Sequence, residues 1–181
     1  MMQSLRGGMT NSKRRSDGFS EEAEREAAIA AAGERVIDAV RAMRKSRDHT
    51  SLQRVIYMLD EHQLTPVQVD ILETVAAGSA MRMSEVAATL GVDASTLTRT
   101  LAPLIEYGFL RRSVAPNDRR VVIVEATAAG IEGACRIGAT RREVMRAVLG
   151  RMAPERIHLL ADLMEEYLRS VAHEARARGV L

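Results

Sequence analysis

Apolar positions recur with a helical period over the first quarter of the chain. Ser20 is a good N-cap, and Glu21 and Glu22 follow it in the first turn, where the helix dipole favours acidic side chains. One stripe then continues at spacings of seven, four and three residues, formed by Ile29, Val36, Val40 and Met43. The pattern predicts a helix over 20–46 that is about 40 Å long. We expect a helix of this length to reach a second chain.

Capping residues predict two further helices before residue 80. The two capping boxes are formed by Thr50 with Gln53 and by Thr65 with Gln68. The first box follows a break at 46–51, and its helix is expected to reach Leu59. In the second, Pro66 takes the first helical position after the N-cap, and Gly78 ends the helix.

Two short helices follow on either side of a tight turn. Ser84 is the expected N-cap of the first helix, which ends at Gly91, and the second helix covers 94–107. The intervening turn is three residues long and contains glycine. Two helices joined in this way are the signature of a helix-turn-helix, whose second helix is the recognition helix.

After Gly108 the apolar period changes from 3.6 to 2. Residues 109–114 and 121–124 are predicted as strands, joined by a polar loop over 115–120. The result is a hairpin with a cationic tip.

Two long helices complete the pattern. Thr127 caps the first, which is expected to end near Leu149, and Pro154 opens the second. The last helix has a heptad-like stripe made of Ile157, Leu160, Met164, Tyr167 and Val171. Such a stripe requires a partner helix, and the simplest partner is another copy of the chain.

The predicted fold is therefore mainly α with a small two- to three-stranded antiparallel β-wing, a winged helix-turn-helix flanked by N- and C-terminal dimerisation helices. The expected segments are a mobile basic tail over 1–19, N-terminal dimerisation helices over 20–63, a winged helix-turn-helix DNA-binding domain over 64–126 and C-terminal dimerisation helices over 127–181.

Composition excludes several classes. With 46% hydrophobic and 28% charged residues in 181, the chain is globular, and it has no apolar run long enough to cross a membrane. The first 20 residues do not resemble a secretory signal, so we expect a cytoplasmic protein. Cys135 is the only cysteine, which excludes an intrachain disulfide and a cysteine-based zinc site. The low aromatic content of 3% disfavours single-stranded DNA or RNA.

Charge is concentrated locally rather than overall. The formal net charge is only +2. Between residues 95 and 120, however, two acidic residues stand against five arginines, which are Arg99, Arg111, Arg112, Arg119 and Arg120. This excess is typical of a surface that contacts a phosphate backbone, although a solvated arginine-rich surface gives the same pattern.

Three segments resemble the MarR (multiple antibiotic resistance regulator) family of bacterial transcription factors. They read LTPVQVDIL from Leu64, MSEVAATLGVDASTLTRTLAPLIEYGFLRR from Met83 and PNDRRVVIVEATAAG from Pro116. The resemblance covers roughly residues 64–133. It implies a winged helix-turn-helix regulator that acts as a dimer and responds to a small molecule. It also implies that Asp118-Arg119-Arg120 is the family's Asp-x-Arg wing signature, whose arginine enters the minor groove.

The candidate DNA contacts follow from groove geometry together with this resemblance. The first turn of a recognition helix faces base edges and phosphates, and an arginine fork suits guanine. We expect Arg99 to read a guanine, with a phosphate contact or an ion pair to an acidic neighbour as alternatives. Asp118 is expected to orient an arginine rather than to touch DNA. Arg111 and Arg112 are expected to contact phosphates or to pair within the domain. The full predicted set is Ser84, Ser95, Thr96, Thr98, Arg99, Arg112, Asp118, Arg119 and Arg120.

The sequence predicts a DNA-binding regulator, a repressor that binds a near-palindromic operator as a homodimer and is released by a small-molecule effector. The resemblance suggests effector contacts at Arg54, Tyr57, Met58, Val67 and Ile71. No cofactor or metal is expected, and the main enzyme motifs are absent, so the chain is not expected to be an enzyme. The alternatives are a thiol- or metal-responsive regulator on the same fold, and an architectural DNA-binding protein without effector. Cys135 lies in a predicted apolar helix, where a buried thiol is inert.

Overall fold

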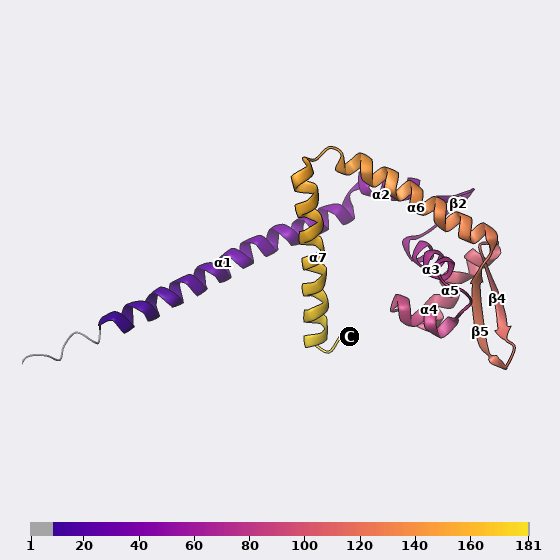
Figure 1. Cartoon of the computed structure of the whole chain (residues 1–181), viewed down its shortest axis with the longest axis horizontal. Coiled ribbons are helices and arrows are strands. Elements are labelled where there is room, and N and C mark those ends of the chain that lie inside the picture. Colours follow the sequence, from indigo (N-terminus) through magenta and orange to yellow (C-terminus); the bar gives the residue numbers. More distant parts are fainter. Residues whose placement is uncertain (1–8, 181) are drawn as a thin grey trace, which may run out of the picture. The chain divides into compact units, whose positions relative to one another are not determined.

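The structure, a computed structural model, describes the backbone of residues 9–180 and the side chains of 22–118 and 120–180. The helices are α1 (Met9–Lys45), α2 (Arg47–Ile56), α3 (Pro66–Ala77), α4 (Met83–Leu90), α5 (Ala94–Glu106), α6 (Ala128–Leu149) and α7 (Pro154–Ala177) (Figure 1). The strands are β1 (Met58–Leu59), β2 (His62–Gln63), β3 (Met81–Arg82), β4 (Leu110–Ala115) and β5 (Asp118–Ala126). The predicted mainly α fold with a small antiparallel wing is confirmed. The chain divides into two compact units, Met1–Ser51 and Leu52–Leu181.

The first unit consists of α1 and the start of α2. α1 begins at Met9, well before the predicted start at Ser20, so residues 9–19 of the predicted tail are helical; residues 1–8 lie outside the described part. The stretch 9–19 has no proline, so every residue in it has a backbone N–H for the helix. The predicted break occurs after Lys45.

The cap that follows the break differs from the predicted one. Ser46, rather than Thr50, caps α2, because the backbone N–H of His49 donates to Ser46 Oγ at 3.1 Å. Thr50 lies inside the helix, and its hydroxyl donates to the Ser46 carbonyl at 3.0 Å. α2 also ends earlier than predicted, at Ile56, and Leu59 lies in β1, which forms a short hairpin with β2.

The core of the second unit is built around α3. Thr65 and Gln68 form the predicted capping box, with Thr65 N donating to Gln68 Oε1 at 2.8 Å and Gln68 N to Thr65 Oγ1 at 3.3 Å. Pro66 begins α3 and Gly78 follows its end. The fully buried side chains of the core come from α3 to α6 and the strands, and include Leu59, Ile71, Leu72, Leu97, Leu101, Leu104, Leu110 and Ile137.

The helix-turn-helix of α4 and α5 has the predicted turn but a different first cap. Gly91 adopts φ 62°, a left-handed conformation in which glycine is favoured. The N-cap of α4 is Arg82, whose backbone N–H donates to Glu85 Oε2 at 2.8 Å. Ser84 therefore lies within α4 and is not its cap, because β3 pairs with β5 and holds the chain in extended form up to Arg82.

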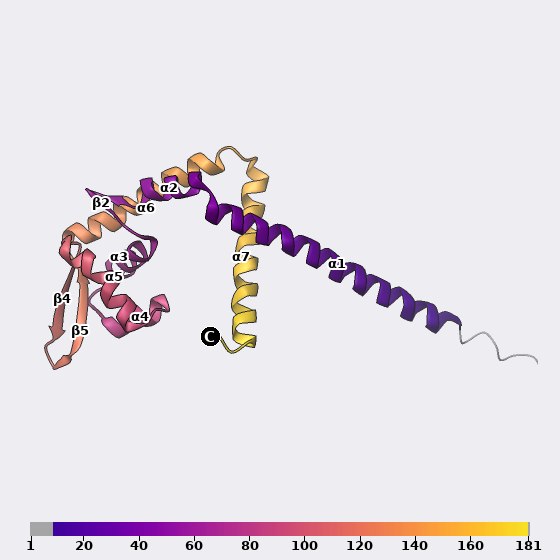
Figure 2. The same cartoon turned by 180° about the vertical axis from the view of Figure 1, so that it is seen from behind.

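The wing is a three-stranded sheet in the order β3-β5-β4, and Figures 1 and 2 both show its β4–β5 hairpin extending beside the helices. The loop predicted over 115–120 is wrong. Asp118 already belongs to β5 and pairs with Ala115, so only Pro116 and Asn117 form the turn. Its carboxylate accepts the backbone N–H of Arg120 at 2.9 Å, which stabilises this early reversal of the chain.

α6 crosses directly over the start of the wing. The Thr127 hydroxyl caps α6 by accepting from Gly130 N at 3.1 Å, and the hydroxyl itself donates to the Gly108 carbonyl at 2.6 Å. A Cβ on Gly130 would lie only 2.0 Å from the carbonyl oxygen of Phe109. Only glycine fits at this crossing.

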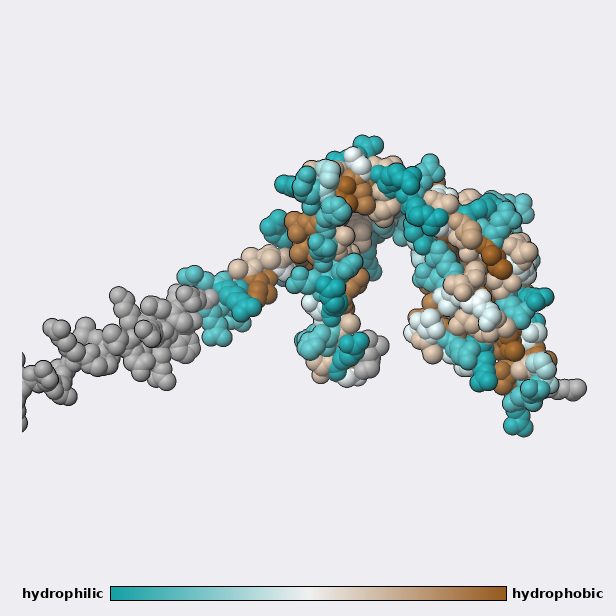
Figure 3. Space-filling view, in the orientation of Figure 1, coloured by the Kyte–Doolittle hydropathy of each residue, from teal (hydrophilic) through white to brown (hydrophobic). Residues whose placement is uncertain are grey.

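α7 has no buried residue. Ile157 is half-buried, and seven further apolar side chains are 40–59% exposed, namely Leu159, Leu160, Leu163, Met164, Tyr167, Leu168 and Val171. Figure 3 shows apolar side chains, in brown, open to the surface among hydrophilic ones. None of the helices in the described part of the chain is both long and apolar enough to span a membrane.

Candidate nucleic-acid interface

The first turn of α5 is organised by Asp93. This N-cap carboxylate accepts the backbone N–H groups of Ser95 and Thr96, both at 2.9 Å. It also accepts the two hydroxyls, from Ser95 Oγ at 2.5 Å and Thr96 Oγ1 at 2.6 Å. The hydroxyl hydrogen bond from Ser95, followed in size of effect by that from Thr96, holds the pKa of Asp93 well below its usual range. The carboxylate is therefore ionised at neutral pH and fixes the start of the helix.

The other predicted α5 contacts lie on the same helix. Thr98 is exposed, and its hydroxyl donates to the Ala94 carbonyl at 2.7 Å. Arg99 is exposed and forms no ion pair with another described side chain. The alternative in which Arg99 bridges to an acidic neighbour is therefore not seen in this structure.

Strand alternation places two wing arginines on the face that meets α5. Side chains two residues apart share one face of a strand, so Arg120 lies on the face of the buried Val124. Arg112 pairs directly with Val124 across the sheet and shares that face. Both arginines line a groove of about 420 Å³ between the wing and the helix-turn-helix.

The same groove brings the two wing arginines together with two predicted residues from other elements and one residue that the sequence analysis missed. Ser84 from α4 and Thr98 from α5 line it with Arg112 and Arg120, and Arg82 of β3 adds a third guanidinium. Among the described side chains, Arg82 is the one arginine of the three that forms an ion pair, with Glu85 at 3.9 Å. The groove is therefore strongly cationic. Arg82 reaches it because β3 pairs with β5, a long-range contact that no local pattern signals.

The two arginines at the start of the wing differ in role. Arg111 lies opposite Glu125, and both its Nε and its Nη2 are 2.6 Å from the Glu125 carboxylate. Arg111 is thus paired within the domain, whereas Arg112 is available in the groove.

Asp118 contacts the main chain of Arg120. It accepts from the backbone N–H of Arg120, as described above, and so shapes the wing turn. The Arg119 side chain lies outside the described residues, and its predicted DNA contact stays a prediction.

The predicted effector residues do not all reach the surface. Ile71 is wholly buried, because its side of α3 packs into the core, and its predicted effector contact stays a prediction. Met58 and Val67 are 47% and 40% exposed, Arg54 is exposed and Tyr57 is half-buried. These four remain predictions.

A separate cleft of about 430 Å³ lies between α3 and α6. Arg141 spans it with a two-pronged ion pair to Glu73, with nitrogen–oxygen distances of 2.9 and 3.1 Å. Cys135 lines this cleft and is exposed, so the expected burial of its thiol is wrong. The thiol faces outward because the buried face of α6 is formed by Gly130, Gly133 and Ile137. No group of three or more His, Cys, Asp or Glu side chains that could hold a metal ion occurs among the described residues.

A family model and several solved structures match this chain. The MarR family model matches residues 64–122. Among solved structures, YusO from Bacillus subtilis is 20% identical, with 75% of this chain and 96% of that chain covered and a TM-score of 0.58. A mutant MarR from E. coli complexed with operator DNA is 22% identical, with 75% and 92% covered and a TM-score of 0.56. The PcaV transcriptional regulator from Streptomyces coelicolor is 21% identical, with 68% and 94% covered and a TM-score of 0.55. Residues 64–122 therefore match the MarR family model, and the chain has the fold that these solved structures share.

Proposed function

We propose that this protein is a cytoplasmic, sequence-specific regulator of transcription that binds double-stranded DNA as a homodimer. The observation that carries the proposal is the groove in which Arg82, Arg112 and Arg120 meet beside the exposed first turn of α5. Three guanidinium groups at a helix-turn-helix attract phosphates, while the α5 side chains face base edges in the major groove. The family consists of transcriptional regulators rather than enzymes.

The homodimer is supported by apolar surface that a single chain leaves in water. α7 exposes a continuous stripe, and Ile29 and Val36 of α1 are 62% and 46% exposed. Exposed stripes of this size on long helices mark association surfaces. In this proposal residues 20–63 and 127–181 form the dimerisation helices and residues 64–126 bind DNA. Two recognition helices then read a near-palindromic operator about one helical turn apart.

The proposal includes repression that is relieved by a small molecule. An effector that binds one dimer geometry better than the other shifts the population and changes the separation of the two recognition helices. Arg54, Tyr57, Met58 and Val67 are the candidate contacts. An architectural DNA-binding role for the same fold is the alternative.

The direct test is selection of duplexes from a random library by the full chain, followed by gel shift of the selected duplex with unrelated duplex as competitor. We expect a near-palindromic consensus and nanomolar binding that the competitor does not remove. Binding equal to that of the competitor, without a consensus, would instead support the architectural alternative.

Arg120→Ala should weaken binding to the selected operator by about tenfold with little change in base preference. The arginine releases counterions when it meets phosphate, so the slope of log K against log salt should also become shallower, by about 0.9 for each phosphate that the variant no longer neutralises. Fluorescence anisotropy across a salt titration measures both. Arg178→Ala is the control, since this exposed arginine pairs with Glu174 at the far end of α7. Parent-like binding by Arg120→Ala at every salt concentration would show that the wing assignment is wrong.

Arg99→Ala should relax the base preference at one position of each half-site. A two-pronged contact from an arginine to guanine is worth about 1–3 kcal/mol of discrimination. Repeating the library selection with the variant measures this directly. A consensus identical to that of the parent would show that Arg99 does not read a base.

A further inference from the structure

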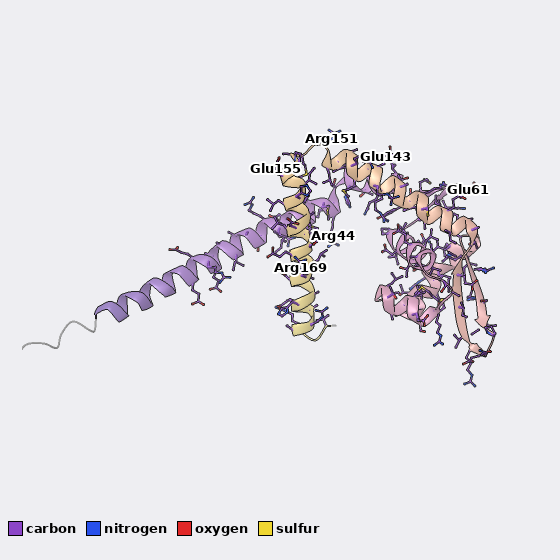
Figure 4. All side chains as sticks on the ribbon, viewed as in Figure 1. Arg44, Glu61, Glu143, Arg151, Glu155 and Arg169 are labelled. Atoms are coloured by element: carbon purple, nitrogen blue, oxygen red, sulfur yellow. The ribbon has the colours of Figure 1, made fainter. Side chains whose placement is uncertain are left out.

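The β1–β2 hairpin contacts both the recognition helix and α6. It joins α2 to α3 and contains only six residues, 58–63. Glu61, labelled in Figure 4, marks its position beside α6. Because α6 belongs to the proposed dimerisation helices and α5 to the DNA-binding domain, the hairpin links the parts that the proposed function requires to act together.

On one side the hairpin is fixed to α6. Leu59 is 1% exposed, and it packs so closely on Gly133 that a Cβ there would lie 2.6 Å from Leu59 Cδ2. Asp60 adds an ion pair with Arg136 of α6 at 2.8 Å. An apolar contact and an ionic contact therefore hold the hairpin against one stretch of this helix.

On the other side the hairpin contacts the end of α5 through His62. The His62 ring stacks on Tyr107, with ring centroids 3.7 Å apart and planes 8° from parallel. It also meets the edge of Phe109 at 6.0 Å. Tyr107 is the C-cap of α5 and Phe109 directly precedes β4 of the wing. His62 thus touches the joint between the recognition helix and the wing.

Backbone hydrogen bonds hold the last turn of α5 to Tyr107 and Phe109, from Tyr107 N to the Pro103 carbonyl at 2.8 Å and from Phe109 N to the Leu104 carbonyl at 2.9 Å. Pro103 lies within α5 and has no N–H to donate to the carbonyl one turn earlier. The hydrogen-bond ladder of the helix is therefore interrupted between the DNA-facing first turn and the C-cap. A contact that fixes Tyr107 also restrains the tilt of the helix.

We propose that His62 is a positioning residue: its stack on Tyr107 fixes the recognition helix relative to α6 and so sets the half-site spacing that the dimer accepts. The inference rests on the proposed function. Base preference within each half-site is read by other side chains and does not depend on His62. The expected signature is therefore a change in spacing selectivity alone.

The experiment uses the full chain and the selected operator with its central spacer lengthened or shortened by one base pair. Each added pair rotates one half-site by roughly 35° about the DNA axis. The parent should bind the altered spacers much more weakly than the original. His62→Leu, which removes the stack, should reduce this discrimination by roughly two- to tenfold for each protomer, the range for removal of an aromatic pair.

Three further measurements separate positioning from general damage. His62→Phe keeps a planar ring on Tyr107 and should restore the parental spacing profile. Arg120→Ala should lower affinity at every spacing by the same factor. In His62→Leu the chemical shifts of the Tyr107 ring protons should differ from those of the parent, because the stacked ring is lost. In His62→Phe the stacked ring remains and should continue to shift these signals. Should His62→Leu fail to fold by circular dichroism, Tyr107→Leu removes the same stack from the other side.

The outcomes are distinct. Parental spacing discrimination in a folded His62→Leu variant would overturn the inference, and so would a His62→Phe variant that behaves like His62→Leu. If the parent itself selects no consensus from the library, it is the proposed function that fails. Unchanged base preference combined with relaxed spacing in His62→Leu supports the positioning role.

Discussion

Replacing Gly130 with alanine should lower the free energy of unfolding by about 3 kcal/mol or more. The new Cβ would lie 2.0 Å from the carbonyl oxygen of Phe109 and 2.9 Å from its carbonyl carbon. Both are backbone atoms, and the same carbonyl accepts the Thr127 N–H at 3.0 Å. The clash is therefore relieved only if α6 moves off the wing. Urea unfolding followed by circular dichroism measures the loss.

Gly138→Ala in the same helix is the matched control. The nearest atom to its new Cβ is the end of the flexible Arg142 side chain, at 3.4 Å. Alanine has the better helix propensity, so this variant should be neutral or up to about 1 kcal/mol more stable. An unfolding midpoint for Gly130→Ala equal to that of the parent would mean that α6 does not cross Phe109 as closely as the structure indicates.

The double substitution Leu160→Glu with Met164→Glu should convert the protein to a monomer and weaken operator binding by about a hundredfold or more. The two side chains are one turn apart on the apolar stripe of α7 and are 40% and 52% exposed. A buried, unpaired carboxylate in a dimer interface costs several kcal/mol, and a monomer holds only one half-site. Sedimentation velocity measures the mass and anisotropy measures the affinity.

Arg169→Glu is the control for charge. It changes the net charge by the same amount as the double variant but lies on the opposite face of α7, where Figure 4 labels it on the helix. It is 69% exposed and pairs with Glu165 at 3.6 Å. This variant should remain dimeric. A dimeric double variant that binds DNA normally would refute the assignment of α7 to the dimer interface.

Local signals in the sequence predict most of the helical architecture. The Thr65–Gln68 box, Gly91 and Thr127 each act within one turn of the chain, and each forms the predicted contact. Where a cap depends on a distant strand, the prediction fails. Ser84 has the right side chain, but β3 pairing with β5 moves the N-cap of α4 to Arg82.

In the candidate site, too, features set by local sequence could be predicted and features set by long-range contacts could not. Arg112 and Arg120 could be predicted from their place in the wing pattern, whereas the contribution of Arg82 to the groove depends on the order of three strands. The complete burial of Ile71 could not be predicted, because core and pocket positions on α3 share one apolar period. The coupling of the hairpin to α5 depends on packing between His62 and Tyr107, which are far apart in the sequence.

The hydrogen bonds of Asp93 have a consequence for how α5 meets a ligand. Ser95 and Thr96 give their hydroxyl protons to the carboxylate, and Thr98 gives its proton to a backbone carbonyl. The oxygens of these three side chains can then accept hydrogen bonds but cannot donate them. A phosphate oxygen only accepts hydrogen bonds. It can therefore bind one of these hydroxyls only after the hydroxyl proton turns away from the carboxylate or carbonyl that now accepts it. For Ser95 and Thr96, a hydrogen bond donated to phosphate therefore competes directly with the hydroxyl bonds that they donate to the Asp93 cap.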